Sequence, residues 1–562
     1  MMTAARISLV FAAAVTLLSA AQTNVQPYIW YRGVVNAASL EGQGLPAGSI
    51  AQGSIFTIFG SNLGPEKATL ATKTFPLPSS LADVSIDVVV NGVTLAAIPL
   101  SVQASSINAI MPSKTPAGQA LVVVHANGKV SNSAKVNVVA ASPGLFSVNN
   151  LGFGPAMAQN QATSGSAPMN TTRASARPGQ TVTLMGTGLG AVPYADNVQP
   201  KTANLATVVE AFVGNQPATV HYSGRASCCA GLDEITFTVP ANAATGCYVP
   251  VQVRTAKTVV SNAATIAINK SGAACADQYN PVGAALLEGG RFGIVTAQRF
   301  SVLDNLDSNP PGQITTDYLF AGLQQDPGGT AFFNPSYSLP PLGTCTMYSI
   351  SAFDGLTSLM LYAPQSQALD AGTALQVAAG GTQATVGRVP GIPQIYGNLL
   401  GEQPAAPGVP TPLYAIPGSY TLTIPGGADV HSAQVTGSFP APLQWTNENS
   451  LSVVNRANPL TVTWTGGNSA RDVVFVGVLS NNDPANSSAA ALCVAPVSAG
   501  KFTVPVEILQ SLPATPASAT RVPAWLLVTS VPLQTPTQFQ ATGLETGYLV
   551  PAAPAVKTIL VQ

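Results

Sequence analysis

Residues 53–65 read GSIFTIFGSNLGP, and residues 179–191 read GQTVTLMGTGLGA. Each stretch is a run of strand-forming residues that ends in a glycine-rich corner, GSNLG or GTGLG. The two stretches align, with Gly60 opposite Gly186 at an offset of 186 − 60 = 126 residues. A strand and a corner that occur twice in this way indicate an internal repeat.

Two further pairs of segments extend the repeat in the same order. INAIMP at residues 107–112 matches ITFTVP at residues 235–240, at an offset of 235 − 107 = 128. VSNSAKVNV at residues 130–138 matches VSNAATIAI at residues 260–268, at an offset of 260 − 130 = 130. The offset drifts by only a few residues, as small loop insertions would produce. We therefore predict a tandem duplication.

Each copy has the pattern of short strands joined by tight turns. The strand face that we expect to be buried in the first copy consists of Val84, Ile86, Val88 and Val90. Asn91-Gly92 follows and favours a two-residue hairpin turn with positive φ angles, and Gly214-Asn215 stands at the corresponding turn of the second copy. Such strands, over about a hundred residues per copy, predict a β-sandwich. A phosphate-binding loop is the alternative for the glycine corners, but no helix and no Gly-Lys-Ser/Thr sequence follows them.

The composition of the 562-residue chain favours several domains built from strands. Charged residues make up only 8%, against about 25% in a typical soluble domain, and 51 Gly and 46 Pro residues interrupt the chain often. The net charge is −1, with 22 Lys and Arg residues and no basic run. Since nucleic acids and acidic membrane surfaces bind clustered positive charge, we expect no nucleic-acid partner.

The N-terminus has the pattern of a secretory signal peptide at residues 1–21. Arg6 supplies the positive charge, residues 7–18 form the apolar segment, and Ser19 and Ala21 are the small residues before a cleavage site. A membrane anchor is the alternative, but it needs about 20 apolar residues and this run is shorter. We expect cleavage after this segment, no membrane span in the mature chain, and a secreted, cell-surface or periplasmic location.

The six cysteines are expected to form disulfides, because the chain is exported and their number is even. A metal site is the alternative, but the spacing is not that of paired ligands and only His221 lies near the cluster. A bridge between Cys345 and Cys493 would close a loop of about 150 residues and stabilise the fold by roughly 4 to 5 kcal/mol. The other four would then form two bridges in or beside the second copy, but six thiols leave further pairings open. The candidates are Cys228, Cys229, Cys247, Cys275, Cys345 and Cys493.

The repeat resembles the IPT/TIG immunoglobulin-like fold and, more closely, a duplicated domain family of exported proteins from soil acidobacteria. The resemblance covers residues 34–268 and rests on VVNAAS, FGSNLGP, ASPGLF and RPGQTVTLMGTGLG. CCAGLDEITFTVP followed by GCYVPV is similar to the cysteine-bearing variant. The family module usually closes its protein, whereas here it begins the mature chain. The resemblance implies two immunoglobulin-like (IPT/TIG-like) sandwiches, at residues 33–143 and 144–272, and brings no catalytic residues.

The second half is also expected to be β-rich, which makes the whole fold all-β. We predict a β-rich region at residues 279–395 and a sandwich-like domain at residues 396–562, which would form one unit if Cys345 pairs with Cys493. Residues 286–302 are predicted to form a β-hairpin. Strands are predicted within residues 343–353, 417–430, 459–467, 472–480 and 491–509. The GGADV and TVTWTGG segments resemble a module that recurs in the same group of exported proteins, and Trp464 is expected in the core.

The search for catalytic or metal-binding residues yields isolated candidates. His125 and His221 are expected at solvent-exposed strand positions, and His431 in a turn. The nearest carboxylate pairs for a glycosidase are Asp233 with Glu234 and Asp83 with Asp87, all within the sandwiches. Asp304, Asp307 and Asn309 lack the alternating spacing and the bidentate glutamate of a calcium loop.

The sequence therefore predicts a protein that is not an enzyme, with no cofactor and no bound metal. It favours a scaffold, adhesion or binding protein, whose partners would be proteins or polysaccharides at the cell surface. One alternative is a carbohydrate-binding protein, which would need an exposed aromatic platform. The four tryptophans available for one are Trp30, Trp445, Trp464 and Trp525. The other alternative is a polysaccharide hydrolase with its site in the C-terminal half.

Overall fold

The computed structural model shows a chain built almost entirely of β-strands, so the predicted all-β fold is confirmed. The residues that it describes are 26–72, 74–162, 167–304, 312–350, 365–403, 418–439, 441–482, 487–516 and 524–562. The predicted signal peptide lies outside these residues, as do Asp307 and Asn309 of the weak calcium candidate.

The first copy of the repeat folds into a two-layer sandwich. Its strands are β1 (Tyr28–Asn36), β2 (Ile50–Ala51), β3 (Ile55–Ser61), β4 (Thr69–Leu70), β5 (Val84–Val90), β6 (Val93–Val102), β7 (Ser106–Ile110), β8 (Gly118–Ala126), β9 (Lys129–Val130) and β10 (Ala134–Val139). They follow the order β1-β3-β7-β6-β5-β8-β10-β2. The first part of the long strand β6 pairs with β5 in one layer, and from Ile98 onward β6 pairs with β7 in the other, with a register shift between Pro99 and Ser101. This arrangement is an immunoglobulin-like sandwich.

The second copy repeats the strand order of the first. Its strands are β11 (Gly144–Leu145), β12 (Gly154–Pro155), β13 (Ala158–Asn160), β14 (Thr181–Thr187), β15 (Val209–Val213), β16 (Gln216–Arg225), β17 (Asp233–Thr238), β18 (Gly246–Thr255), β19 (Val259–Val260) and β20 (Ala264–Ile268). The order β11-β14-β17-β16-β15-β18-β20-β12 matches that of the first copy strand by strand. The sequence repeat is therefore a repeat of the immunoglobulin-like fold.

The local strand signals correctly predicted the hairpins of both copies. Along β5 every second residue is buried, as the alternation of valine and isoleucine with polar residues requires. Asn91 and Gly92 join β5 to β6 with φ angles of 48° and 79°, and Gly214 and Asn215 join β15 to β16 with 54° and 64°. Both turns thus have the positive φ angles of a two-residue hairpin.

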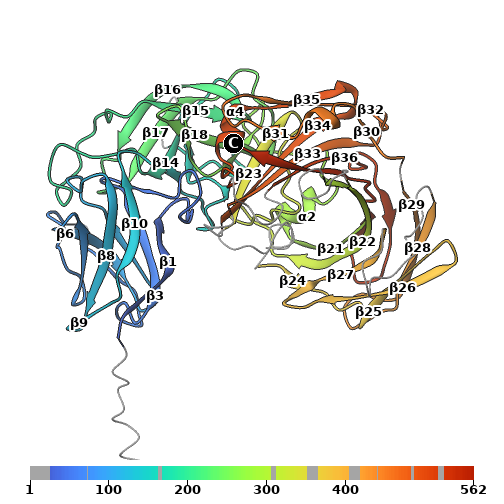
Figure 1. Cartoon of the computed structure of the whole chain (residues 1–562), viewed down its shortest axis with the longest axis horizontal. Coiled ribbons are helices and arrows are strands. Elements are labelled where there is room, and N and C mark those ends of the chain that lie inside the picture. Colours follow the sequence, from blue (N-terminus) through green and yellow to red (C-terminus); the bar gives the residue numbers. More distant parts are fainter. Residues whose placement is uncertain are drawn as a thin grey trace, which may run out of the picture.

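Most strands of the C-terminal half belong to one hydrogen-bonded sheet, seen in yellow-green to red in Figure 1. The strands are β21 (Gly290–Asp304), β22 (Gly312–Asp326), β23 (Thr344–Ile350), β24 (Gln367–Ala368), β25 (Ala374–Ala379), β26 (Thr382–Val389), β27 (Ile392–Gln403), β28 (Ser419–Ile424), β29 (Ala433–Ser438), β30 (Gln444–Trp445), β31 (Val453–Val454), β32 (Leu460–Thr465), β33 (Val473–Asn482), β34 (Ser487–Pro496), β35 (Lys501–Val504), β36 (Ala524–Val531), β37 (Thr537–Phe539), β38 (Thr546–Leu549) and β39 (Ala555–Val561). The main order is β23-β34-β33-β36-β39-β21-β22-β27-β26-β25-β28-β29, with β30, β32 and β35 in a separate small sheet. The sheet therefore joins strands from both predicted regions, and β27 spans their predicted boundary between residues 395 and 396.

Two short helices replace predicted strands. Residues 286–302 are not a hairpin, because α2 (Gly283–Glu288) precedes one long strand, β21, which pairs along its length with β22. Alanine, leucine and glutamate favour the helix, and Gly289, with φ 84°, ends it. The predicted run of strands at residues 491–509 likewise ends in α4 (Val506–Gln510), which follows Pro505. The prediction that Trp464 is a core residue is confirmed, since it is 3% exposed and its indole Nε1 donates to the Val497 carbonyl at 3.0 Å.

Candidate functional site

The three histidines lie at separate places and form no common site. Nε2 of His125 on β8 is 2.9 Å from Oδ2 of Asp87 on β5, and both side chains are partly exposed. His221 on β16 is exposed, with Nε2 2.6 Å from the Thr238 hydroxyl, and His431 is exposed after β28. Within the described ranges, no three His, Cys, Asp or Glu side chains gather as metal ligands would.

Of the two carboxylate pairs predicted as glycosidase candidates, Asp233 with Glu234 is divided between two environments. Asp233 and Glu234 are neighbours on β17, so their side chains point to opposite faces of the sheet. Asp233 is fully buried, whereas Glu234 is partly exposed. The two cannot flank one sugar, because the Asp233 carboxylate is enclosed between the two sandwiches.

Asp233 belongs to a buried polar joint between the two sandwiches, which we call the first joint. Its Oδ1 pairs with Nη1 of Arg225, while its Oδ2 accepts a hydrogen bond from the Leu189 amide at 2.9 Å. Nη2 of Arg225 donates to the carbonyl of Gly53 in the first sandwich and to that of Gly190 in the second, each at 2.7 Å. Burial raises the pKa of Asp233, and Arg225 opposes that shift. One guanidinium therefore ties the sandwiches together where the glycine corner GTGLG of the second copy ends.

Further hydrogen bonds extend the first joint on both sides. The Ile55 amide at the start of β3 donates to the Thr187 hydroxyl at the end of β14, at 2.8 Å. The Ser113 amide and hydroxyl both donate to the carboxylate of Asp196. The Asn36 side chain at the end of β1 donates to the Ser142 carbonyl at 3.1 Å. The joint thus consists of directional contacts whose groups come from both sandwiches or from the segment that links them.

A second joint, mainly apolar, connects the second sandwich to the C-terminal half. Tyr248 of β18 packs edge-on against Phe333, with ring centroids 5.4 Å apart. Phe153, from the loop between β11 and β12, lies 6.0 Å from Phe333 and 6.0 Å from Tyr348 of β23. These rings belong to one buried cluster that also includes the Cys247–Cys275 disulfide. The second sandwich therefore shares a hydrophobic core with the C-terminal half.

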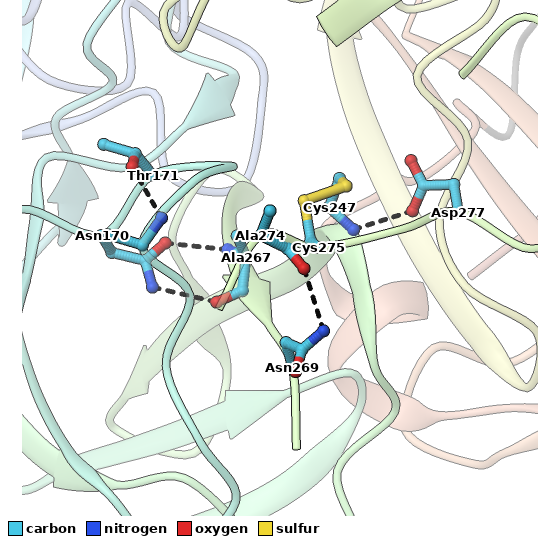
Figure 2. Close-up of a disulfide and its surroundings, with 9 residues drawn as sticks. Asn170, Thr171, Cys247, Ala267, Asn269, Ala274, Cys275 and Asp277 are labelled. Atoms are coloured by element: carbon cyan, nitrogen blue, oxygen red, sulfur yellow. Dashed lines mark hydrogen bonds between the residues drawn. A yellow bond between two sulfur atoms is a disulfide. The ribbon is translucent and has the colours of Figure 1, made fainter. Parts of the chain in front are cut away.

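Figure 2 shows the polar groups around the Cys247–Cys275 disulfide. The Asn170 side chain donates to the Ala267 carbonyl at 2.9 Å and accepts from the Ala267 amide at 2.8 Å, which fixes the neighbouring strand β20. The Cys247 amide donates to Oδ1 of Asp277 at 2.7 Å. Burial raises the pKa of Asp277 to about 6, and the Cys247 amide opposes the shift. A carboxyl group that titrates near neutral pH thus lies inside the second joint.

The loop between β1 and β2 makes a third contact with the C-terminal half. Leu45 is buried in the hydrophobic core beneath β33, β34 and β36, where Ala263 of the second sandwich also packs. The Ser487 hydroxyl of β34 donates to the Gln43 carbonyl at 2.7 Å. In the same loop Glu41 is 3% exposed, and burial raises its pKa to about 8. All three parts of the chain therefore meet beside this loop.

All six cysteines are joined in pairs. Besides Cys247–Cys275, the structure joins Cys345 on β23 to Cys493 on β34, across directly paired residues of the sheet. The neighbours Cys228 and Cys229 are joined to each other in the exposed loop between β16 and β17. Every disulfide lies in the second sandwich or beyond it.

A small hollow in the C-terminal half has no catalytic arrangement. Its volume is about 270 Å³, just below the roughly 300 to 1,000 Å³ of typical ligand pockets. Arg299 lines it and pairs with the buried carboxylate of Asp317 at 2.6 Å. Ser301 and Thr315 carry the hydroxyl groups of its wall, and among the described residues no histidine and no carboxylate lines the hollow. Among the described residues, no helix is long and apolar enough to cross a membrane.

Sequence reasoning missed the joints and one exposed group of aromatic residues. The joints join residues far apart in sequence, such as Arg225 and Gly53, and no local pattern marks them. The aromatic group did leave a signal, because Tyr28 and Trp30 alternate with Ile29 at the start of β1. Of the four tryptophans, Trp445 and Trp464 are buried and Trp525 is half-buried, whereas Trp30 is 50% exposed.

The chain shows weak likenesses to solved structures. No protein-family model matches the chain, and no curated protein matches it. The I9–I11 tandem of titin is similar over 69% of this chain and 94% of its own, at 6% identity and a TM-score of 0.12. Domains 5–6 of the S-layer protein SbsC are similar over 43% and 98%, at 11% identity and a TM-score of 0.16. A gamma-CGTase from alkalophilic Bacillus clarkii is similar over 50% and 36%, at 11% identity and a TM-score of 0.16. Likenesses at these TM-scores carry no argument about this chain.

Proposed function

We propose that this protein is an exported, non-catalytic scaffold or adhesion protein, related to the duplicated IPT/TIG-like modules of exported acidobacterial proteins. The observation that carries the proposal is the pair of buried joints. Domains that move freely are usually joined by small, polar, wetted contacts. Here a buried guanidinium links the two sandwiches, and a shared aromatic core links the second sandwich to the C-terminal half. Such an arrangement suits a spacer that holds a surface at a fixed position.

The state of the polar side chains supports a non-catalytic role. Buried acids such as Asp233 and Asp317 are engaged by Arg225 and Arg299. Catalysis by a carboxylate needs that group to face a substrate within hydrogen-bond reach. These two buried carboxylates therefore stabilise the fold instead of facing a substrate.

Export is supported by the cysteines as well as by the N-terminal sequence. Disulfides form and persist in secreted, surface and periplasmic proteins, where the environment is oxidising. Three disulfides in a chain with only 8% charged residues fit that environment. The proposed location is therefore outside the cytoplasm.

The test begins with the full-length gene product expressed in a bacterium that has a secretion pathway. N-terminal sequencing of the exported protein should start at Gln22. Its small-angle scattering should match the curve calculated from the structure, and Asp233→Asn should broaden the distance distribution by loosening the first joint. Turnover of any polysaccharide or ester in a broad hydrolase screen would contradict the non-catalytic role.

A further inference from the structure

Three neighbouring aromatic side chains at the start of β1 are strongly exposed to solvent. Tyr28 is 51% exposed, Trp30 is 50% exposed and Tyr31 is 82% exposed. Among the aromatic residues that the structure describes, no other side chain is as exposed as these three. An exposed cluster of large apolar side chains on a soluble protein marks a binding surface. We call these three residues, together with Arg32, the β1 aromatic row.

The conformation of β1 creates this row. Tyr28 and Trp30 lie on one face of the strand, opposite the fully buried Ile29. The pairing of β1 with β3 shifts register between Ile29 and Val34, and Arg32 has a φ of 56°. A bulge of this kind redirects the side chains beside it. Tyr31 points into solvent there, with the Arg32 guanidinium 5.1 Å from its ring centroid.

The β1 aromatic row lies in the N-terminal part of β1, and the other end of this strand reaches the first joint. Asn36, at the other end of β1, bonds to Ser142 in the first joint. Tyr28 pairs with Ser61 of β3 and Asn36 with Phe56, five residues apart on that strand, which places Tyr28 about 17 Å from Asn36 at ~3.3 Å per strand residue. The row and the first joint are therefore at opposite ends of β1.

The backbone of Ile29 on β1 is already hydrogen-bonded and cannot pair with a strand from a partner. The Ile29 amide donates to Oδ1 of Asn132 at 2.7 Å, and the Asn132 amide group donates back to the Ile29 carbonyl at 3.0 Å. Addition of a peptide strand would require these backbone groups to be free. A partner must therefore bind through the side chains.

We propose that the β1 aromatic row is a binding site for a neutral polysaccharide, an inference that deepens the proposed scaffold function by naming its partner. The C–H faces of sugar rings are apolar and pack on aromatic rings, while sugar hydroxyls take up hydrogen bonds from groups such as the Arg32 guanidinium and tyrosine hydroxyls. The row runs along one strand and is narrow, which suits an extended polymer. A stable protein partner would need about 800 Å² of surface on each side. The β1 aromatic row is small, because Ile29, between Tyr28 and Trp30, and Val34, just beyond Arg32, are buried.

A lipid surface and a second copy of the chain are the competing occupants. Tyrosine and tryptophan also gather at membrane–water boundaries, but adsorption usually needs several basic residues, and the row has only Arg32. The low overall charge of the chain, 8%, likewise favours an uncharged partner.

The experiment measures retention of the exported protein by insoluble cellulose, chitin and xylan. The wild-type protein should bind at least one of them, and Trp30→Ala combined with Tyr31→Ala should weaken that binding by about tenfold or more, since each ring loses its stacking contact. Leu70→Ala is the matched control, because Leu70 is 71% exposed on β4 at the opposite edge of the same sheet. It should bind as the wild type does. Circular dichroism and an unchanged thermal midpoint would show that both variants are folded.

Four other results would overturn the inference. No retention of the wild type by any of the three polymers would contradict it, as would equal retention of the double variant. Binding of phosphatidylcholine vesicles that the double variant loses, without binding of polysaccharide, would identify a lipid surface. Dimerisation that the double variant abolishes would identify a second copy. Hydrolysis of a retained polymer would instead contradict the non-catalytic function and leave the site in place, so the two failures are distinguishable.

Discussion

The two sandwiches share one strand order but differ in what covers their outer faces. In the first copy, the outward residues of β8 stay in contact with solvent, and buried and more exposed residues alternate along the strand. In β18, the corresponding strand of the second copy, every residue except Arg254 is buried. The same contrast separates β10, which alternates, from β20, which is buried throughout. The outer face of β8 and β10 in the first sandwich is therefore exposed to solvent. The corresponding face of β18 and β20 in the second sandwich is covered by other parts of the chain.

This difference shows which residues specify the fold and which specify the assembly. The inward valines of β18, such as Val251 and Val253, repeat the role of Val122 and Val124 in β8. The outward residues have diverged: Gln252 is 2% exposed and donates to the Ser511 hydroxyl at 3.3 Å in the C-terminal half. Duplication thus preserved the core pattern, while the outer face of one copy became part of a joint.

The largest expected effect comes from removing disulfides, which the second sandwich and the C-terminal half have and the first sandwich lacks. Cys345→Ala with Cys493→Ala opens a loop of sequence separation 148 and should lower the free energy of unfolding by about 5 kcal/mol. Loss of Cys247–Cys275, with separation 28, should cost about 3.5 kcal/mol. Guanidinium unfolding measures both, and hydrogen exchange should find the first sandwich unchanged. As a control, Cys228→Ser with Cys229→Ser should cost only about 1 kcal/mol. Equal losses in all three variants would contradict the loop-length argument.

The next effect concerns the first joint. Asp233→Asn leaves the buried Arg225 guanidinium without its counter-charge, and removal of one partner from a buried ion pair costs about 3 to 5 kcal/mol. Urea unfolding measures the loss. Glu210→Gln is the matched control, because Glu210 pairs with Arg254 at 2.8 Å but its side chain is 42% exposed. That substitution should cost about 1 kcal/mol or less. If both variants lost the same stability, the Asp233 pair would not be holding the sandwiches together.

Much of the architecture could be predicted because it follows from local alternation. The buried face of β5, the Asn91-Gly92 turn and the core position of Trp464 depend on residues close in sequence. The two short helices were missed because five or six residues give too little periodicity to distinguish a helix from a strand. In α2 and α4 the helix is set by individual residues, such as Gly289 after one helix and Pro505 before the other.

The candidate sites were harder to predict, because they depend on tertiary structure. Arg225 could not be placed in the first joint from its own neighbourhood, since its carbonyl partner Gly53 is 172 residues away. Part of the β1 aromatic row could be predicted, because Tyr28 and Trp30 are two residues apart and therefore lie on the same face of a strand. The exposure of Tyr31 depends on the bulge before Val34, and no local sequence pattern predicts that bulge.

A pH effect should distinguish the second joint from the free faces of the first sandwich. The pKa of Asp277 is raised from 3.8 to about 6, so the folded protein holds this proton more tightly than the unfolded chain. The contribution of Asp277 to the free energy of unfolding is complete below pH 3.8 and is lost as the pH rises to about 6. The change is about 3 kcal/mol, at ~1.4 kcal/mol per pKa unit. Asp277→Asn cannot ionise and should lack this part of the pH dependence when unfolding is measured from pH 3.5 to 7. Asp83→Asn, at an exposed turn of the first sandwich, is the control. A wild-type pH profile in Asp277→Asn would show that this carboxyl is not the titrating group.

The smallest expected effect compares the two equivalent hairpin turns. The first central residue is Asn91 in the first copy and Gly214 in the second, and both have positive φ angles that asparagine tolerates. A Cβ atom on Gly214 would lie 3.2 Å from Cγ2 of Thr344 and 3.3 Å from Cγ1 of Val249, because this turn packs against the C-terminal half. Gly214→Asn should therefore cost about 1 to 2 kcal/mol through overpacking, whereas Asn91→Gly, in an exposed turn, should cost about 0.5 kcal/mol. Urea unfolding of the two variants measures the difference. Equal costs would mean that the second turn is as free of the C-terminal half as the first, which would contradict the contrast between the two copies.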